Sequence, residues 1–251
     1  MKGIKFFVAI FLCLVLSIGM AITSLAIDSG FSLETVSEEK ANDFVSNVNI
    51  SITYEEPPKK SIDEFAVNAD GMIAIAQANM SSYKTICVYS DEGVFQYAFS
   101  FRSSGDVAVE WDEENLNIYF VRSDKIVSIA PNGEVVGVVE ILDTKENNSY
   151  RNHILGANEY VVGDKEYSIK SDIGILWIVS FSYSQLIVKD SNGESKIIYD
   201  VNSAHLVKMI ISTVAILTLF LLAIISSVKQ VKRYSREWRA TSTDSTTHKN
   251  N

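Results

Sequence analysis

The sequence predicts a mainly β protein in which about three four-stranded units precede one C-terminal transmembrane helix. Three observations lead to this prediction. Short strand-type runs separated by Gly-containing turns recur between residues 61 and 204. A long uncharged apolar run lies near each end of the 251-residue chain. Between these two runs the sequence shows almost no helical periodicity, so strands dominate the expected fold.

The C-terminal apolar run, "MIISTVAILTLFLLAIISSV", covers Met209–Val228. Twenty helical residues span about 30 Å, which is the thickness of the hydrocarbon core of a bilayer. The run has no charge and no polar stripe, unlike a helix on the surface of a soluble domain. We therefore expect a transmembrane helix at 207–228.

The next eleven residues, "KQVKRYSREWR", are strongly basic, so the positive-inside rule places the C-terminus in the cytoplasm. We expect a basic cytoplasmic tail at 229–251, with a disordered end. The residues expected at the membrane interface are Lys208, Lys229, Lys232, Arg233, Tyr234, Arg236, Trp238 and Arg239.

The N-terminal apolar run forms part of residues 1–26, which carry Lys2 and Lys5 near their start and end in Ser-Leu-Ala. This pattern is typical of a cleaved signal peptide, but its apolar stretch is also long enough for an uncleaved signal anchor. Both alternatives place residues 27–206 on the extracytoplasmic side of the cell membrane. The protein is then single-pass if the segment is cleaved and two-pass if it is retained.

The extracytoplasmic segment is acidic, because residues 27–206 contain 13 Lys and Arg against 29 Asp and Glu. Such a segment repels phosphate backbones, which argues against nucleic acid as a partner. The expected partners are instead membrane lipid and a protein, or a second copy that pairs through an exposed β edge.

The strand-type runs repeat as a unit. "ICVYSDEG" (86–93), "IVSIAPNG" (126–133) and "LIVKDSNG" (186–193) each place apolar residues before a turn glycine. Upstream, "FAVNADGMIAIA" (65–76) and "VAVEWDEENLNIYFV" (107–121) both indicate strand, acidic turn and strand. One complete unit therefore contains four strands in about 40 residues.

This pattern resembles a β-propeller blade of the NHL type, over residues 65–139. The whole chain is similar to small bacterial membrane-anchored proteins of unassigned function, a resemblance that implies no activity. Closed propellers have about four to eight blades, so three units imply an open or incomplete arrangement. Either the units stack, with 49–56 and 140–160 covering the ends, or an exposed edge pairs with another chain.

The remaining segments set the domain boundaries. The charged stretch 28–48 predicts a short helix or a flexible stalk, and "NISITYEE" that follows predicts a strand. We therefore expect a stalk and first strand at 27–60, and the β-repeat domain at 61–204.

No residue pattern predicts a catalytic site or a cofactor. His153 is the one histidine well inside the domain, in an expected surface loop. Cys87 alternates with apolar residues and is expected to be small and buried. The acidic residues Asp112, Glu113 and Glu114 are best explained as a solvated turn, with weak calcium binding as the less favoured alternative. Three N-x-S sequons begin at Asn49, Asn79 and Asn147.

The expected function is a membrane-anchored extracytoplasmic β-repeat domain for binding or scaffolding. The alternative is an accessory subunit of a membrane signalling or assembly complex, acting through its transmembrane helix and basic tail. An enzyme that uses the acidic turn and His153 is the third and least favoured hypothesis.

Overall fold

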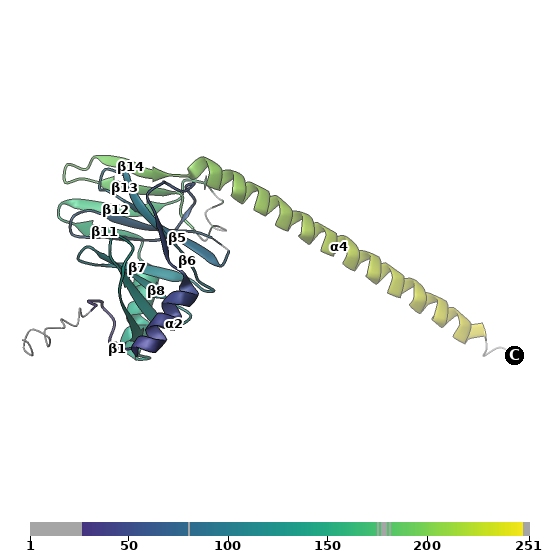
Figure 1. The fold of residues 1–251 in the computed structure, drawn as a ribbon. Helices are drawn as coiled ribbons and strands as arrows, with labels where there is room; N and C mark the ends of the chain where they lie inside the picture. Colours follow the sequence, from purple (N-terminus) through teal and green to yellow (C-terminus); the bar gives the residue numbers. More distant parts are fainter. Residues whose placement is uncertain (1–26, 80, 175, 177–179, 181, 248–251) are drawn as a thin grey trace, which may run out of the picture.

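The computed structural model describes residues 27–247 except 80, 175, 177–179 and 181 (Figure 1). The expected signal or anchor at 1–26 lies outside the described residues. The described strands form three antiparallel sheets, and one long helix follows them. The prediction of a mainly β protein with a C-terminal apolar helix is therefore confirmed.

Each sheet contains four strands that follow one another along the chain and pair in that order. The first sheet contains β3 (Ile62–Val67), β4 (Ile73–Gln77), β5 (Tyr83–Tyr89) and β6 (Phe95–Arg102). The second contains β7 (Val107–Asp112), β8 (Asn115–Phe120), β9 (Lys125–Ile129) and β10 (Val135–Ile141). The third contains β11 (Glu159–Val162), β12 (Lys165–Lys170), β13 (Gln185–Lys189) and β14 (Ser195–Asp200).

The turn glycines that revealed the repeat are needed for two reasons. Gly93 and Gly133 close the β5–β6 and β9–β10 turns with φ of +85° and +88°, a conformation that residues with a Cβ rarely adopt. Both turns also pack closely on other segments. A Cβ on Gly93 would lie 2.8 Å from the carbonyl oxygen of Ile198, and one on Gly133 would lie 3.0 Å from Ile52. The turns thus shape the hairpins and let neighbouring segments approach.

The N-terminal segment is packed against two of the sheets. β1 (Leu33–Thr35) pairs with β10, and β2 (Ser51–Thr53) pairs with β6. Between them, α2 (Glu38–Val48) places Val48 in the core with 5% of its surface exposed. The stretch for which the sequence left a stalk open therefore forms a helix and adds a fifth strand to two sheets.

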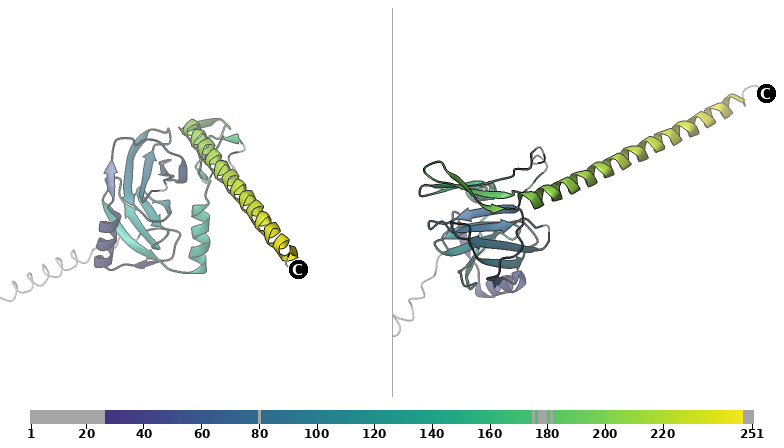
Figure 2. Two further views of the ribbon diagram at one scale, coloured as in Figure 1. Left: turned by 90° about the vertical axis from the view of Figure 1, so that its right-hand side faces the viewer. Right: turned by 90° about the horizontal axis from the view of Figure 1, so that it is seen from above.

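The three sheets stack with the first sheet in the middle (Figure 2). The middle position is clearest at β4, where all five residues are buried. Ala74 and Ala76 pack in the cluster shared with the second sheet, and Ile73 and Ile75 in the cluster shared with the third. An antiparallel sheet usually has one solvated face, whereas this one has none at its centre. Cys87 on β5 is fully buried as predicted.

β3 of the first sheet and β7 of the second sheet end side by side. The indole nitrogen of Trp111 donates to the carbonyl oxygen of Ala66 at 3.3 Å, and the Asn68 amide donates to the Glu113 carbonyl oxygen at 3.4 Å. β3 and β7 therefore run side by side in the same direction. We call the end of the stack at which these two strands finish the distal end.

The opposite end carries the long helix, and we call it the helix end. Ile62, the first residue of β3, bridges Tyr183, which precedes β13. The Tyr199 hydroxyl near the end of β14 donates to the carbonyl oxygen of Lys60 at 2.6 Å. The third sheet therefore ends beside the start of β3, and α4 (Asn202–Thr247) leaves the stack from this end (Figure 1).

A helix covers the outer face of the second sheet. The sequence predicts a loop around His153, but α3 (Lys145–Leu155) is helical and begins after a Thr144 cap whose hydroxyl accepts from the Asn147 amide. Ile154 packs against Ala108 and Tyr119 of the sheet. The prediction of a loop was wrong because tertiary contacts, rather than a strong apolar period, hold this helix.

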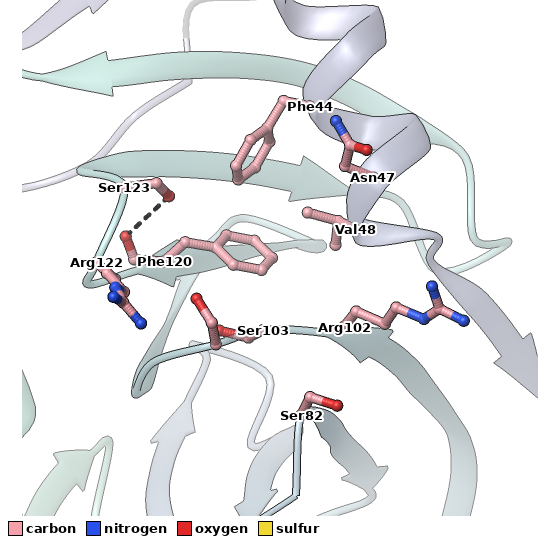
Figure 3. A pocket seen from close by; sticks show the side chains of 10 residues that line it. Phe44, Asn47, Val48, Ser82, Arg102, Ser103, Phe120, Arg122 and Ser123 are labelled. Carbon is pink, nitrogen blue, oxygen red and sulfur yellow. Dashed lines mark hydrogen bonds between the residues drawn. The ribbon is translucent and has the colours of Figure 1, made fainter.

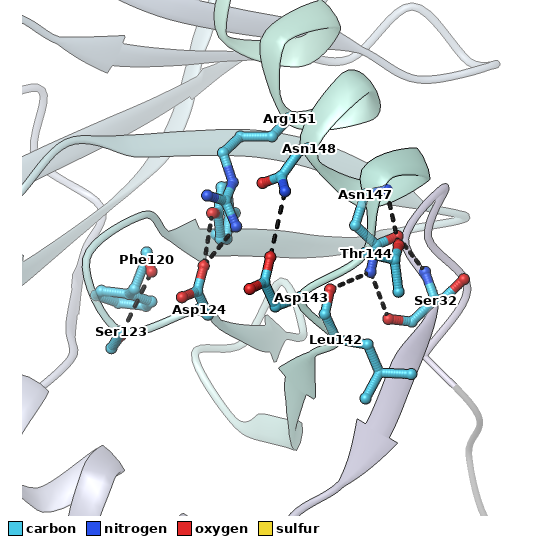
Figure 4. Close-up of polar contacts among 11 residues, drawn as sticks. Ser32, Phe120, Ser123, Asp124, Leu142, Asp143, Thr144, Asn147, Asn148 and Arg151 are labelled. Atoms are coloured by element: carbon cyan, nitrogen blue, oxygen red, sulfur yellow. Dashed lines mark hydrogen bonds and ion pairs between the residues drawn. The ribbon is translucent and has the colours of Figure 1, made fainter.

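Asn147 is the main polar link between α3 and the N-terminal segment (Figure 4). Its side-chain nitrogen donates to the carbonyl oxygens of Ser32 at 2.9 Å and Leu142 at 2.7 Å, and its oxygen accepts from the Ser32 amide at 2.8 Å. Only 2% of Asn147 is exposed. A glycan on this nitrogen is incompatible with the fold, so the sequon at Asn147 differs from the exposed one at Asn49.

The helix α4 contains the predicted transmembrane segment. Residues Asn202–Tyr234 form the one candidate membrane span among the described residues, with a mean hydropathy of 2.6 and none of its apolar window buried. The helix continues to Thr247, so its backbone is helical through most of the stretch for which the sequence predicts disorder. Figure 2 shows α4 extending away from the sheets without folding back on them.

We predict that N147A lowers the free energy of unfolding of the full chain by about 2–4 kcal/mol, because three hydrogen bonds at a buried site are lost. N148A is the matched control, since exposed Asn148 makes one hydrogen bond to Asp143 at 3.2 Å and its loss should cost less than about 1 kcal/mol. Urea unfolding in detergent measures both values. Equal losses for the two variants would contradict the role of Asn147.

Candidate binding clefts

Two clefts lie between the first and second sheets, at opposite ends of their strands. The distal cleft has a volume of about 460 Å³, and the basic cleft at the helix end has a volume of about 480 Å³. Ends of layered sheets collect polar side chains from turns and helices, and binding sites often form there.

The distal cleft is lined by aromatic and acidic side chains from β7, β11 and α3. The lining side chains that can contact a ligand through a polar or aromatic group are those of Glu110, Trp111, Glu113, Tyr150, His153 and Tyr160. Aromatic faces together with carboxylates suit a ligand that carries hydroxyl groups or a positive charge.

Glu110 is the centre of the polar contacts in this cleft. Its carboxylate accepts hydrogen bonds from the Ser29 hydroxyl at 2.7 Å and from the Tyr150 hydroxyl. The Tyr150 ring lies directly over Gly30, in space that any Cβ at this position would occupy. The N-terminal segment therefore closes one wall of the cleft and fixes the carboxylate.

The two tyrosines of the cleft are held in their protonated form. Burial raises the pKa of Tyr150, and the hydrogen bond to Glu110 raises it further. Burial also raises the pKa of Tyr160 to about 12, with smaller contributions from the carboxylates of Glu64 and Glu110. Both hydroxyls consequently remain hydrogen-bond donors at any physiological pH.

Glu64 on β3 is a further unusual acid near this cleft. Burial, followed by the charges of Asp63 and Asp106, raises the pKa of Glu64 from 4.5 to about 9. The side chain is therefore neutral at pH 7. Perturbed acids cluster at functional sites, although buried acids in structural positions behave in the same way.

The residues singled out in the sequence are only partly brought together. Glu113 and His153 line the distal cleft, and both are exposed. Asp112 lies beside it and accepts from the Asp28 amide at 2.9 Å, whereas Glu114 does not line the cleft. The acidic turn of this hairpin is tight, because Asp112 pairs directly with Asn115. Among the described residues, no three His, Cys, Asp or Glu side chains form a metal-binding group.

The basic cleft lies beneath α2 at the helix end (Figure 3). Phe44, Val48 and Phe120 form its apolar wall, with the rings of Phe44 and Phe120 in an edge-to-face contact at 5.2 Å. Arg102 and Arg122 lie on opposite sides of this wall (Figure 3). The other lining residues are Asn47, Ser82, Ser103, Ser104 and Ser123, so none is acidic.

The two arginines of this cleft come from different sheets. Arg102 ends β6, and its guanidinium donates two hydrogen bonds to the Tyr83 hydroxyl, from Nε at 2.9 Å and from Nη2 at 2.7 Å. Arg122 lies in the β8–β9 turn, and no carboxylate pairs with it in the described part of the chain. The sequence did not predict this cleft, although "FRSS" and "VRSD" repeat an Arg-Ser pair in a segment with three arginines.

A serine–histidine contact occurs where α4 begins. The Ser180 hydroxyl lies 2.9 Å from Nε2 of His205, which is 5% exposed. Nδ1 of His205 has no hydrogen-bond partner among the described residues. A hydrolytic triad needs a carboxylate at that nitrogen, so this pair does not define a catalytic site.

No protein-family model and no curated protein matches the chain. The crystal structure of a protein of unknown function from Bacteroides caccae is similar over 59% of this chain and 69% of its own, with 16% sequence identity and a TM-score of 0.28. This similarity is too weak to indicate the fold or the function of the chain. The class of the protein therefore follows from its own architecture: three antiparallel sheets and one apolar helix of membrane-spanning length.

We predict that E64Q stabilises the protein increasingly as the pH rises. Because the folded state keeps Glu64 neutral up to about pH 9 and the unfolded state ionises it near 4.5, wild-type stability is lost through this interval. Gln is always neutral, so the gain should be near zero at pH 4 and about 1–3 kcal/mol at pH 8, after allowing for partial solvent screening. Urea unfolding at both pH values measures it. A gain independent of pH would contradict the assignment.

Proposed function

We propose that this protein is a membrane-anchored extracytoplasmic domain that binds or scaffolds a partner. The observation that carries the proposal is the combination of a stack with a doubly buried middle sheet and a single apolar helix leaving one end. Such a stack is a rigid platform on a tether. The proposal assigns binding, rather than a reaction, to this platform.

The orientation in this proposal rests on charge. The described residues Lys229, Lys232 and Arg233 follow the apolar stretch directly, which favours a cytoplasmic C-terminus. The side chains of Arg236, Trp238 and Arg239 lie outside the described set, although their backbone belongs to α4. The acidic stack then lies on the extracytoplasmic side.

The distal cleft is the proposed contact site for a soluble partner. It lies at the end of the stack opposite α4, so it faces away from the membrane. Exposed Glu113 and His153 line this cleft together with the aromatic side chain of Trp111. Donors, acceptors and an aromatic surface are all available there to a hydroxylated or cationic group.

The second candidate function is an accessory subunit that acts through α4. The apolar window of α4 contacts none of the sheets, so a partner helix could pack against it as well as lipid. Replacing Met209–Val228 with an unrelated apolar helix separates the two functions. Loss of function with an intact stack would favour the subunit.

We predict that protease added to intact cells removes residues 28–204 and leaves the C-terminal tail intact. An epitope tag after Asn251 and antibodies against the stack follow the two parts on immunoblots. Cells opened by detergent provide the control, because the tail should then be cut as well. Cleavage of the tail in intact cells would overturn the orientation.

We predict that a photoreactive amino acid at position 113 or 153 forms a cross-linked product in cells. The same amino acid at position 170 should not, because Lys170 is exposed on the third sheet, away from the distal cleft. Mass spectrometry of the product reports the contact. Products of equal yield from all three positions, or none from the cleft positions, would contradict the proposed site.

A further inference from the structure

The basic cleft combines features that fit an anion with an apolar part. Residues 27–206 contain only three arginines. Arg151 is paired with Asp124 at 2.5 Å, and the other two, Arg102 and Arg122, both line this cleft. Two of the three arginines of a strongly acidic segment therefore border one cavity, on its two sides, and that cavity has no acidic lining residue. Guanidinium groups bind phosphate and carboxylate oxygens strongly.

The rest of the lining complements these charges. The hydroxyls of Ser82 and Ser104 are exposed at the cleft and make no hydrogen bond within the described residues. They can donate to the oxygens of a bound anion. The rings of Phe44 and Phe120 form the apolar wall between the arginines (Figure 3). Phe120 is only 4% exposed, so the partly buried Phe44 supplies the ring surface that carbon atoms attached to the anion would cover and a small inorganic ion would not.

The position of the cleft identifies the source of such a ligand. Arg102 ends β6 at the helix end, where β3 begins at Ile62. About seven helical residues, or roughly 10 Å, separate the start of α4 at Asn202 from Met209, the first residue of the apolar run. The headgroup layer of one leaflet is about 5–8 Å thick. This end of the stack therefore stands close to the level of the lipid headgroups.

We infer that the basic cleft binds the phosphate-bearing headgroup of an anionic membrane lipid. This inference rests on the proposed membrane anchoring. The guanidinium groups of Arg102 and Arg122 contact headgroup oxygens at the two sides of the cleft, and the partly buried Phe44 ring contacts the adjoining carbon atoms. Binding ties the stack to the outer leaflet and fixes its orientation on α4. A free phosphate monoester shares this chemistry, and the experiment separates the two sources.

Hydrogen exchange of the full chain in lipid nanodiscs tests the inference. One nanodisc contains only zwitterionic phosphatidylcholine, and the other contains about 30% phosphatidylglycerol. A positional readout is needed because the basic residues after Val228 respond to anionic lipid in any case. We expect exchange in peptides covering 100–105 and 120–125 to slow at least threefold with the anionic lipid.

Three variants localise the effect. R102Q and R122Q should each remove most of the protection, and since both residues are exposed the fold should survive. K170Q removes the same charge from the third sheet and should retain the protection. Raising the salt concentration should weaken the effect, because exposed charges are screened. Equal protection in both nanodiscs, or protection that persists in both arginine variants, would overturn the inference.

Two further arms separate the alternatives. Inorganic phosphate and phenyl phosphate are added at millimolar concentration to the zwitterionic nanodiscs. Protection by either that equals the effect of phosphatidylglycerol would overturn the lipid source in favour of a soluble phosphate. A chain that fails to remain in nanodiscs of either composition would instead refute the proposed anchoring, so the two failures are distinguishable.

Discussion

The burial of the first sheet on both faces is the constraint on which the rest of the structure depends. In β4, isoleucines point to the third sheet and alanines to the second. The small side chains of Ala74 and Ala76 leave room for the large aromatic residues of the same cluster, Phe99 and Phe101. Each buried isoleucine contributes about 1.5–3 kcal/mol relative to an exposed one, so this strand stabilises both interfaces. The one described cysteine is buried without a disulfide, so packing, together with a few hydrogen bonds between the sheets, holds the described layers.

This arrangement determines where polar chemistry can occur. The clusters between the sheets are apolar, so polar chemistry is confined to the ends of the strands and to the outer faces. At the distal end, the N-terminal segment and α3 bring Glu110 and Tyr150 together. At the helix end, α2 covers a space between two sheets that Arg102 and Arg122 border. The outer face of the third sheet is the least covered, with Val161 and Ile197 exposed by 69% and 49%.

Local features of the fold could be predicted from the sequence because short-range chemistry determines them. Glycine at 93 and 133 fixes the hairpins, and the uncharged run Met209–Val228 identifies the apolar helix. The order of the layers could not be predicted, since nothing local distinguishes a strand buried on one face from β4, which is buried on both. The resemblance to propeller blades remains a prediction about the units, and the structure shows a stack of three sheets.

The clefts were largely beyond prediction for a related reason. Phe44, Arg102 and Arg122 are far apart in the sequence and meet only when α2 covers the junction of two sheets. The distal cleft was predicted in part, because Glu113 and His153 were noticed as polar groups, but Glu110 acquires its role through contacts with Ser29 and Tyr150. A sequon at Asn147 likewise gave no sign that its side chain is buried.

Native-state hydrogen exchange of the full chain in detergent tests the central role of the first sheet most directly. If the sheet is held from both faces, the amides of β4 and β5 should exchange only through global unfolding, with an opening free energy equal to that of unfolding. Amides of β14, at an edge of the third sheet, should exchange through smaller openings. Exchange of the β4 amides as fast as those of β14 would contradict this account.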